Sequence, residues 1–119
     1  MEYRRFDPSV LKDRTMANTF YEQLQEVINR ESGQLGKMEQ LAVYYHEPNG
    51  ASLLVTDLGY HNPYLIRLYC KDESGERRVV LAHMNSVQLL LAVEKVEIRS
   101  PKRTIGFVGQ SPPDENDES

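Results

Sequence analysis

Apolar residues recur at helical spacing near the start of the chain, which predicts an amphipathic helix over about residues 17–31. Residues 19–22 match a capping box at its beginning, and the Ser-Gly pair at residues 32–33 matches a C-terminal stop. Further upstream, an Asp-Pro pair predicts a short helix over about residues 7–14. The apolar stripe of the main helix consists of four residues at i, i+4, i+7 and i+8: Phe20, Leu24, Val27 and Ile28.

The middle of the chain changes to an alternation of apolar and polar residues, which is the pattern of half-buried strands. The Asn-Gly pair at residues 49–50 lies between two such runs and predicts a hairpin. Residues 57–59 are expected to end the second strand, and residues 60–62 to form a loop at the sheet edge. Short connections predict an antiparallel meander of four strands, over residues 41–46, 53–55, 64–71 and 77–83.

The third of these strands has two different faces, because successive side chains of a strand point to opposite sides of the sheet. The core face carries Ile66, Leu68 and Cys70, and the opposite face carries Leu65, Arg67 and Tyr69.

A second apolar run follows the strands and predicts a second helix, capped by Asn85 or Ser86. The run is apolar nearly all round, whereas a surface helix shows one stripe, so we expect this helix to be buried on two sides. In so small a domain the second side would be a subunit contact, which predicts a homo-oligomer. After Pro101 the pattern predicts a short strand over residues 104–108. The apolar residues of the predicted second helix are Val87, Leu89, Leu90, Leu91 and Val93.

The predicted fold class is therefore α+β, with an N-terminal helix, a four-stranded antiparallel meander, a second buried helix and a short C-terminal strand. A chain of 119 residues predicts one ligand-binding domain, over residues 1–109. Residues 110–119 combine Ser-Pro-Pro with acidic residues and cannot form a core, which predicts a disordered acidic tail.

The net charge of −4 is concentrated in this tail. The chain has 18 acidic and 14 basic residues, so removing the four acids of the tail leaves 14 of each. A neutral body argues against DNA binding, which needs many basic residues to displace counterions. It is compatible with a local pocket for a small anion. The four acids are Asp114, Glu115, Asp117 and Glu118.

Several features predict a cytoplasmic protein that does not bind membranes. No run of 18 apolar residues is present, so we expect no transmembrane helix. The N-terminal residues lack the apolar segment of a secretion signal. The lone Cys70 cannot form an internal disulfide, and its place in a strand-like run favours a small buried hydrophobe over a nucleophile.

The sequence contains few of the motifs that are typical of catalytic or metal sites. Its three histidines and one cysteine form no HxxxH, HxH or CxxC pair, so we expect no metal site. No serine stands in a Gly-x-Ser-x-Gly elbow. His83 and Ser86 are close together at a predicted strand-to-helix junction, where a helix cap is the more ordinary interpretation. We therefore expect a protein that is not an enzyme and needs no cofactor.

Binding of a nucleotide-like ligand is better supported by the sequence. Rings beside basic and amide residues could stack on a base, read its edge and bind phosphate. The N-terminus of the second helix could receive a phosphate, or could be self-capped. Tyrosines in strands could equally be half-buried packing residues. The candidate ligand-binding residues are Tyr60, His61, Asn62, Arg67, Tyr69, His83, Asn85, Gln88, Arg103 and Phe107.

Three segments, residues 55–63, 83–91 and 103–107, resemble the first-described Thoeris anti-defence family of phage and prophage proteins. The resemblance covers most of residues 17–109. It implies a sponge that binds glyco-cyclic ADP-ribose without cleaving it, with some members also holding cyclic di- or trinucleotides. It further implies a homo-oligomer, from dimer to hexamer, with pockets at subunit contacts, in the cytoplasm of an infected or lysogenic host cell.

Two other functions stay open at this point. The protein could be a small interaction module that docks a partner through its apolar second helix. It could also be a hydrolase or nuclease of unknown type.

Overall fold

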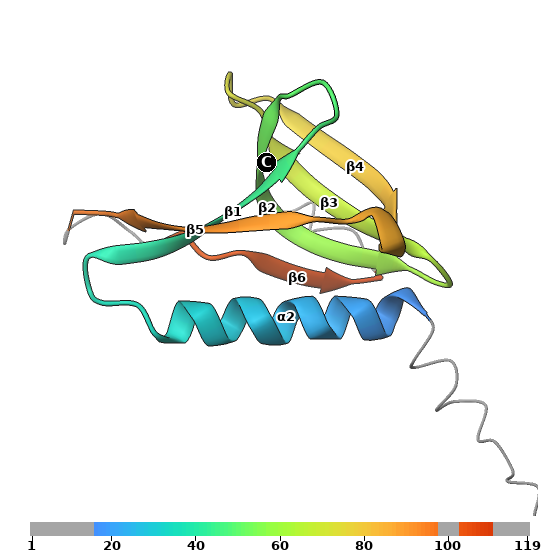
Figure 1. The fold of residues 1–119 in the computed structure, drawn as a ribbon, viewed down its shortest axis with the longest axis horizontal. Coiled ribbons are helices and arrows are strands. Elements are labelled where there is room, and N and C mark those ends of the chain that lie inside the picture. Colours follow the sequence, from blue (N-terminus) through green and yellow to red (C-terminus); the bar gives the residue numbers. More distant parts are fainter. Residues whose placement is uncertain (1–15, 98–102, 111–119) are drawn as a thin grey trace, which may run out of the picture.

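The computed structural model describes residues 16–97 and 103–110, which form one long helix and a bent sheet (Figure 1). The expectations for residues 7–14, for Pro101 and for the acidic tail from Ser111 onward lie outside the described residues. The elements are helix α2 (Ala17–Gly33) and strands β1 (Glu39–His46), β2 (Ser52–His61), β3 (Leu65–Lys71), β4 (Arg77–His83), β5 (Leu89–Lys95) and β6 (Gly106–Gly109), with a single 3₁₀ turn, η1 (Met84–Ser86), before β5.

The sheet has the order β4-β3-β2-β1-β5, and all four of these pairings are antiparallel. β1 pairs with β2 near its beginning, at Ser52–Leu54, and β6 pairs in parallel further along, at Asp57–Gly59. A register shift between Val55 and Asp57 marks the place where β2 exchanges one neighbour for the other. The β1–β5 ribbon therefore leaves β2 halfway, and β6 takes its place beside α2 (Figure 1).

The helix α2 begins two residues before the predicted capping box. Its N-cap is Met16, whose side chain accepts no capping hydrogen bond. The exposed N–H groups of the first turn are instead satisfied by the turn between β2 and β3. The N–H of Ala17 donates to the carbonyl of Pro63 at 2.7 Å, and the N–H of Asn18 donates to Asn62 Oδ1 at 3.1 Å. Asn62 thus caps a helix 44 residues away from it in the chain.

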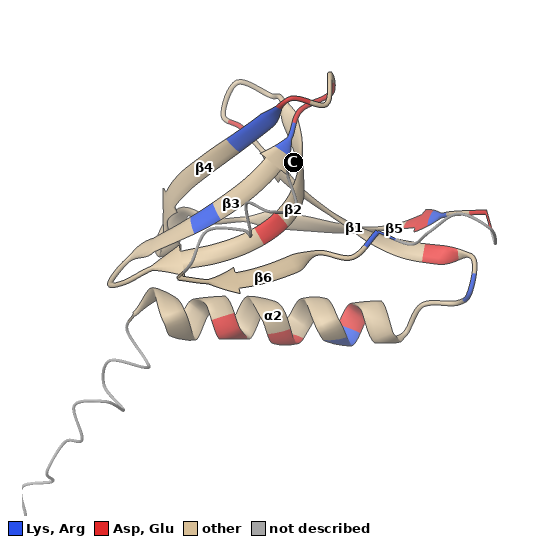
Figure 2. Ribbon diagram, turned by 180° about the vertical axis from the view of Figure 1, so that it is seen from behind, with Lys and Arg blue, Asp and Glu red and all other residues tan. Residues whose placement is uncertain are grey.

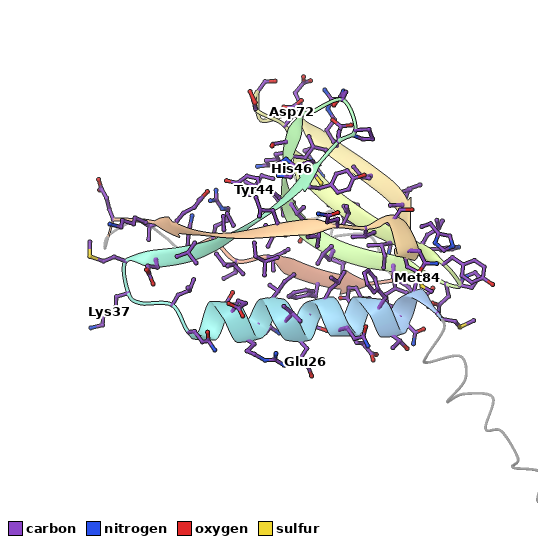
Figure 3. The ribbon with its side chains drawn as sticks, in the orientation of Figure 1. Glu26, Lys37, Tyr44, His46, Asp72 and Met84 are labelled. Carbon is purple, nitrogen blue, oxygen red and sulfur yellow. The ribbon has the colours of Figure 1, made fainter. Side chains whose placement is uncertain are left out.

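The core lies between α2 and one face of the sheet. Ala17, Tyr21 and Ile28 point from the helix into this core, whereas Glu26 points away from the sheet (Figure 3). The predicted core face of the third strand is confirmed, because its three alternate residues are at most 2% exposed. The sheet contributes Val43, Leu53, Val55, Leu58, Ile66, Leu68 and Cys70.

The predicted second helix is wrong, and with it the number of strands. The chain makes one 3₁₀ turn and then extends as β5, which pairs with β1 from Glu39↔Lys95 to Tyr45↔Leu89. The sheet thus has six strands among the described residues, instead of a four-stranded meander and one short strand. A short apolar run fits a buried strand as well as a buried helix, and here pairing with β1 decides.

The second strand is also longer than predicted. Asp57–Gly59 lies inside β2, where these residues form the bulge and the pairing with β6. Tyr60 and His61 end the strand instead of forming a loop, and the turn begins at Asn62. Within the described residues, no helix is long and apolar enough to cross a membrane.

Candidate ligand-binding face

The face of β2, β3 and β4 that turns away from α2 brings together four of the predicted ligand-binding residues. Directly paired residues in antiparallel strands share a face, so the strand register defines its members. We call this surface the outer face, and it consists of three rows across the strands: His61, Leu65 and His83; Gly59, Arg67 and Leu81; Asp57, Tyr69 and Val79.

Arg67 lies in the middle row of the outer face. Its Nη2 donates to the carbonyl oxygens of Gly109 at 2.8 Å and of Tyr60 at 3.2 Å, and its Nη1 donates to Tyr69 Oη at 2.9 Å. The guanidinium carbon also lies 5.7 Å from the centre of the Tyr69 ring. These three hydrogen bonds hold the guanidinium in one orientation on the outer face.

Gly59 makes this arrangement possible. A Cβ at this position would lie 2.8 Å from the carbonyl oxygen of Gly109 and 3.0 Å from Arg67 Nη2. The missing side chain lets the guanidinium cross β2 and reach the end of β6. Figure 2 shows the sheet from behind, with basic segments in the middle of β3 and at the start of β4.

Two rings form a stacked pair at the turn end of the outer face. The rings of Tyr64 and His83 lie 5.4 Å apart between centroids, at an interplanar angle of 19°. Tyr64 is 51% exposed, and His83 is exposed as well. The N–H of Asn85 donates to Nδ1 of His83 at 3.1 Å, which places the proton of the neutral imidazole on Nε2. The sequence predicted His83 as a ligand-binding residue but not its pairing with Tyr64.

Two predicted stacking rings belong to the core instead. Tyr60 lies 4.9 Å from Tyr21 of α2, and Phe107 lies 6.1 Å from the same ring in an edge-to-face arrangement. Tyr21 Oη accepts a 3.0 Å hydrogen bond from the N–H of Gly109, and burial raises its pKa. The three rings join α2 to β2 and β6, so packing explains Tyr60 and Phe107 without a ligand.

Three other predicted residues are not members of the three rows that define the outer face. Asn62 uses its side-chain oxygen to cap α2. Asn85 and Gln88 are exposed, and the helix N-terminus that would have carried them is a 3₁₀ turn of three residues. That turn is too short to offer a phosphate the dipole of a helix, so the helix N-terminus on which this possible phosphate site depended is absent from the described residues.

Arg103 lies on the β1–β5 ribbon, not on the outer face. Its Nη2 donates to Glu94 Oε1 at 3.0 Å, and its backbone N–H donates to Gln40 Oε1 at 2.9 Å. Tyr44 Oη donates to the other oxygen of Glu94 at 2.5 Å, and this bond raises the pKa of Tyr44. The carboxylate of Glu94 thus balances the charge of Arg103.

Sequence reasoning missed a serine–histidine pair on the β1–β2 hairpin. Ser52 Oγ and His46 Nδ1 lie 2.8 Å apart, because the two residues are directly paired in the sheet. A nucleophile and a base at this distance resemble part of a catalytic triad. Across the described residues, however, no carboxylate hydrogen-bonds the other nitrogen of the His46 ring. The pair is exposed and lacks the third group that would orient the base.

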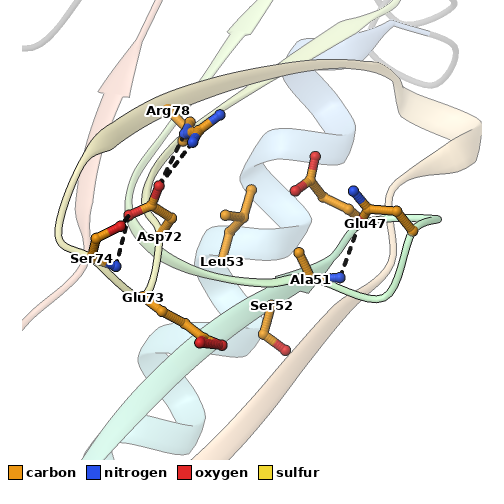
Figure 4. A pocket seen from close by; sticks show the side chains of 9 residues that line it. Glu47, Ala51, Ser52, Leu53, Asp72, Glu73, Ser74 and Arg78 are labelled. Atoms are coloured by element: carbon orange, nitrogen blue, oxygen red, sulfur yellow. Dashed lines mark hydrogen bonds and ion pairs between the residues drawn. The ribbon is translucent and has the colours of Figure 1, made fainter.

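An open hollow of about 380 Å³ lies between the β1–β2 and β3–β4 turns (Figure 4). Asp72 organises one side of it, accepting from the backbone of Glu76 and Ser74 and from the guanidinium of Arg78. The backbone bond from Glu76 and then the Arg78 contact lower the pKa of Asp72. Glu47 and Glu73 add acidic side chains, so the hollow is a poor site for an anion. No group of three potential metal ligands occurs in the described part of the chain.

Comparisons with known proteins identify neither a family nor a function for this chain. No protein-family model matches the chain, and searches of curated proteins and of solved structures found no match. The resemblance to the Thoeris anti-defence family therefore rests on the three sequence segments alone.

Proposed function

We propose that the protein is a binding protein that sequesters a small cyclic nucleotide signal on the outer face without cleaving it. The observation that carries this proposal is the placement of Arg67 among Tyr69, His83 and the exposed Leu81 on one side of the sheet. The sequence resemblance suggests glyco-cyclic ADP-ribose as the ligand and immune evasion by a phage protein as the role, in the cytoplasm of an infected or lysogenic host cell.

The chemistry of the outer face suits such a ligand. A pyrophosphate needs a fixed cationic donor, and Arg67 is held in one orientation by its three bonds. An adenine needs a ring or an apolar surface on which to lie. The Tyr64–His83 pair offers exposed rings, and Val79 and Leu81 are 58% and 61% exposed.

A second copy of the chain would complete the site. The outer face is one side of a sheet, whereas binding sites for small molecules usually bury about 70–90% of the ligand surface. A two-fold dimer that places two outer faces together would enclose two ligands in equivalent positions. We therefore propose a homo-oligomer, from dimer to hexamer, as the functional form.

The function is tested by mixing the protein with cyclic ADP-ribose isomers, removing unbound ligand and analysing the complex by native mass spectrometry. Denaturation should then release the ligand with its mass unchanged. Recovery of linear ADP-ribose would show an enzyme and contradict the proposal. The same assay with cyclic di- and trinucleotides tests the wider ligand range.

A protein partner is the second candidate, and a specific observation favours it. β4 is an edge strand of the sheet, and its exposed Val79 and Leu81 are large apolar residues. An exposed apolar edge strand can pair with an extended segment of another protein. A thermal-shift screen separates the two candidates, because a bound nucleotide must raise the melting temperature by mass action. No stabilisation by any cyclic nucleotide would favour the protein partner.

A further inference from the structure

The backbone of β4 alternates between groups that bond to β3 and groups that point away from the sheet. Two hydrogen bonds, one at each end of the β3–β4 pair, show which residues are which. The N–H of Asp72 donates to the carbonyl of Glu76 at 2.9 Å, and the N–H of Met84 donates to the carbonyl of Tyr64 at 2.7 Å. Hydrogen-bonded pairs alternate along an antiparallel ladder, and this register has no shift, so the even-numbered residues of β4 bond to β3. The odd-numbered residues therefore direct their N–H and C=O groups away from the sheet.

Two of these odd-numbered residues, Val79 and Leu81, are large, apolar and more than half exposed. β4 lies at one end of the sheet order and, among the described residues, pairs with β3 alone. Natural edge strands are usually protected from further pairing by a charge, a proline or a bulge. Residues 79–82 contain no charge and no proline, and the pairing with β3 has no bulge. This edge is therefore open to another strand in both its backbone and its side chains.

The opposite edge strand, β5, is less suited to such pairing. The N–H of Val96 donates to the carbonyl of Met38 at 2.8 Å, so the odd-numbered residues of β5 are the ones that point outward. Of these, Leu91 packs against the core, and the exposed Val93 is followed two residues later by Lys95. The outward positions of β5 thus lack the neighbouring pair of exposed apolar residues that β4 carries.

A second copy of the chain fits the edge of β4 with full overlap of the two strands. When two β4 strands run antiparallel about a two-fold axis at Val80, Val79 of each copy lies opposite Leu81 of the other. Their outward backbone groups then meet, and each pair exchanges both of its N–H···O bonds. The four side chains form one apolar cluster. Arg78 lies opposite Ala82 of the second copy, so the two Arg78 side chains are at opposite ends of the contact and do not repel each other.

We propose that two copies of the chain associate through antiparallel pairing of their β4 strands about Val80. The sheets of the two copies then join into one continuous sheet, and the two outer faces lie side by side. One strand from each copy buries less surface than the roughly 1,200–2,000 Å² of a standard interface, so the dimer is weak and reversible. We expect a dissociation constant on the order of 100 µM.

The inference goes beyond the proposed function, because the pairing needs no ligand and commits β4 to a second copy instead of an unrelated protein. It is tested in the full chain, ¹⁵N-labelled and without ligand, at about 20 µM and about 1 mM, on either side of the expected dissociation constant. One measurement is the exchange rate of the backbone amides with water by NMR. The other is sedimentation velocity, which gives the mass of the assembly at the same concentrations.

We expect the amides of Val79 and Leu81 to exchange at least about threefold more slowly at the higher concentration, where sedimentation should show mainly dimer. The amides of residues 78, 80 and 82 are internal controls, because they bond to β3 in both forms. These rates should not depend on concentration.

A pair of charges on the edge should abolish the dimer. The double variant Val79→Lys, Leu81→Lys should stay monomeric at both concentrations, because edge lysines oppose strand pairing. The matched control is Leu90→Lys, Val93→Lys, which places the same charges at exposed positions of β5 and should dimerise like the wild type. The wild-type comparison stands on its own if either variant fails to fold.

Two results would overturn the inference. One is a wild-type protein whose Val79 and Leu81 amides exchange at the same fast rate at both concentrations, whether sedimentation shows a monomer or a dimer. The other is slower exchange of Leu91 and Val93 at the higher concentration, which would show pairing through β5. Neither result bears on sequestration of a ligand, because no cyclic nucleotide is present in the sample.

Discussion

Arg67 and Gly109 are joined by a 2.8 Å hydrogen bond from the guanidinium to the backbone carbonyl, across the top of Gly59. This bond links β3 to the end of β6, two strands that are not neighbours in the sheet. It fixes both the cationic centre of the outer face and the point where the chain leaves the sheet. Stability and the candidate site therefore depend on the same contact.

Replacing Gly59 should disrupt this contact. The new Cβ of Gly59→Ala would lie 2.8 Å from the Gly109 carbonyl oxygen and 3.0 Å from both Arg67 Nη2 and Val108 Cγ2. We expect the free energy of unfolding to fall by about 1–3 kcal/mol, as for other overpacked positions. The matched control is Gly33→Ala, where a Cβ meets nothing within 4 Å at the end of α2. Equal stability of the two variants in urea denaturation would contradict the role of Gly59.

Removing the side-chain cap of α2 should destabilise the protein although the changed residue lies in a β-turn. Asn62→Ala deletes the acceptor of the Asn18 N–H, and we expect a loss of about 1 kcal/mol, as for an N-cap. Asn62→Asp keeps an acceptor and adds a negative charge at the helix N-terminus, so its stability should match or exceed the wild type. Asn85→Ala, at an exposed position, should change stability by less than about 0.5 kcal/mol. A neutral Asn62→Ala would contradict the capping role.

Stability should fall at alkaline pH through Cys70. Burial raises the pKa of its thiol from 9.0 to about 12, so between these values the folded chain holds a proton that the unfolded chain releases. The free energy of unfolding then decreases as pH rises above 9, by up to about 1.4 kcal/mol per pH unit.

The measurement is denaturant unfolding of wild type and Cys70→Ala at pH 8, 9 and 10. The alanine variant should be less stable at pH 8, because it leaves a small cavity, but should lose less stability between pH 9 and 10. Parallel pH dependence of the two proteins would show that Cys70 does not ionise in this window.

Arg103 should not be needed for ligand binding. Its guanidinium pairs with Glu94 on the β1–β5 ribbon, and both side chains are partly exposed. Arg103→Gln should cost less than about 1 kcal/mol of stability, the usual value of an exposed ion pair. Calorimetric titration with a cyclic ADP-ribose isomer should give an affinity within about twofold of the wild type. Loss of binding would move the site to the ribbon.

The local patterns predicted helix α2 and the existence of strands β1 to β4, because an apolar stripe and an Asn-Gly turn act over a few residues, but they made β2 too short. They failed for residues 89–93, where an apolar run fits a buried strand or a buried helix and pairing with β1 decides between them. The sequence predicted only those features of the candidate site that follow from strand alternation. Alternation placed Arg67 and Tyr69 on one face, but capping by Asn62 and the packing of Tyr60 against Tyr21 depend on contacts between distant segments.

The most direct test of the outer face compares two exposed leucines on the two edge strands. Leu81 on β4 is 61% exposed and pairs with Arg67, whereas Leu90 on β5 is 50% exposed and pairs with Tyr44. A glutamate at either position should be tolerated, but at position 81 it adds a negative charge beside the proposed phosphate site.

Isothermal titration calorimetry with glyco-cyclic ADP-ribose therefore tests the central claim. We predict that wild type and Leu90→Glu bind with equal affinity and that Leu81→Glu binds at least about tenfold more weakly, a difference of about 1.4 kcal/mol. Equal binding by Leu81→Glu, or no binding by the wild type, would contradict the account.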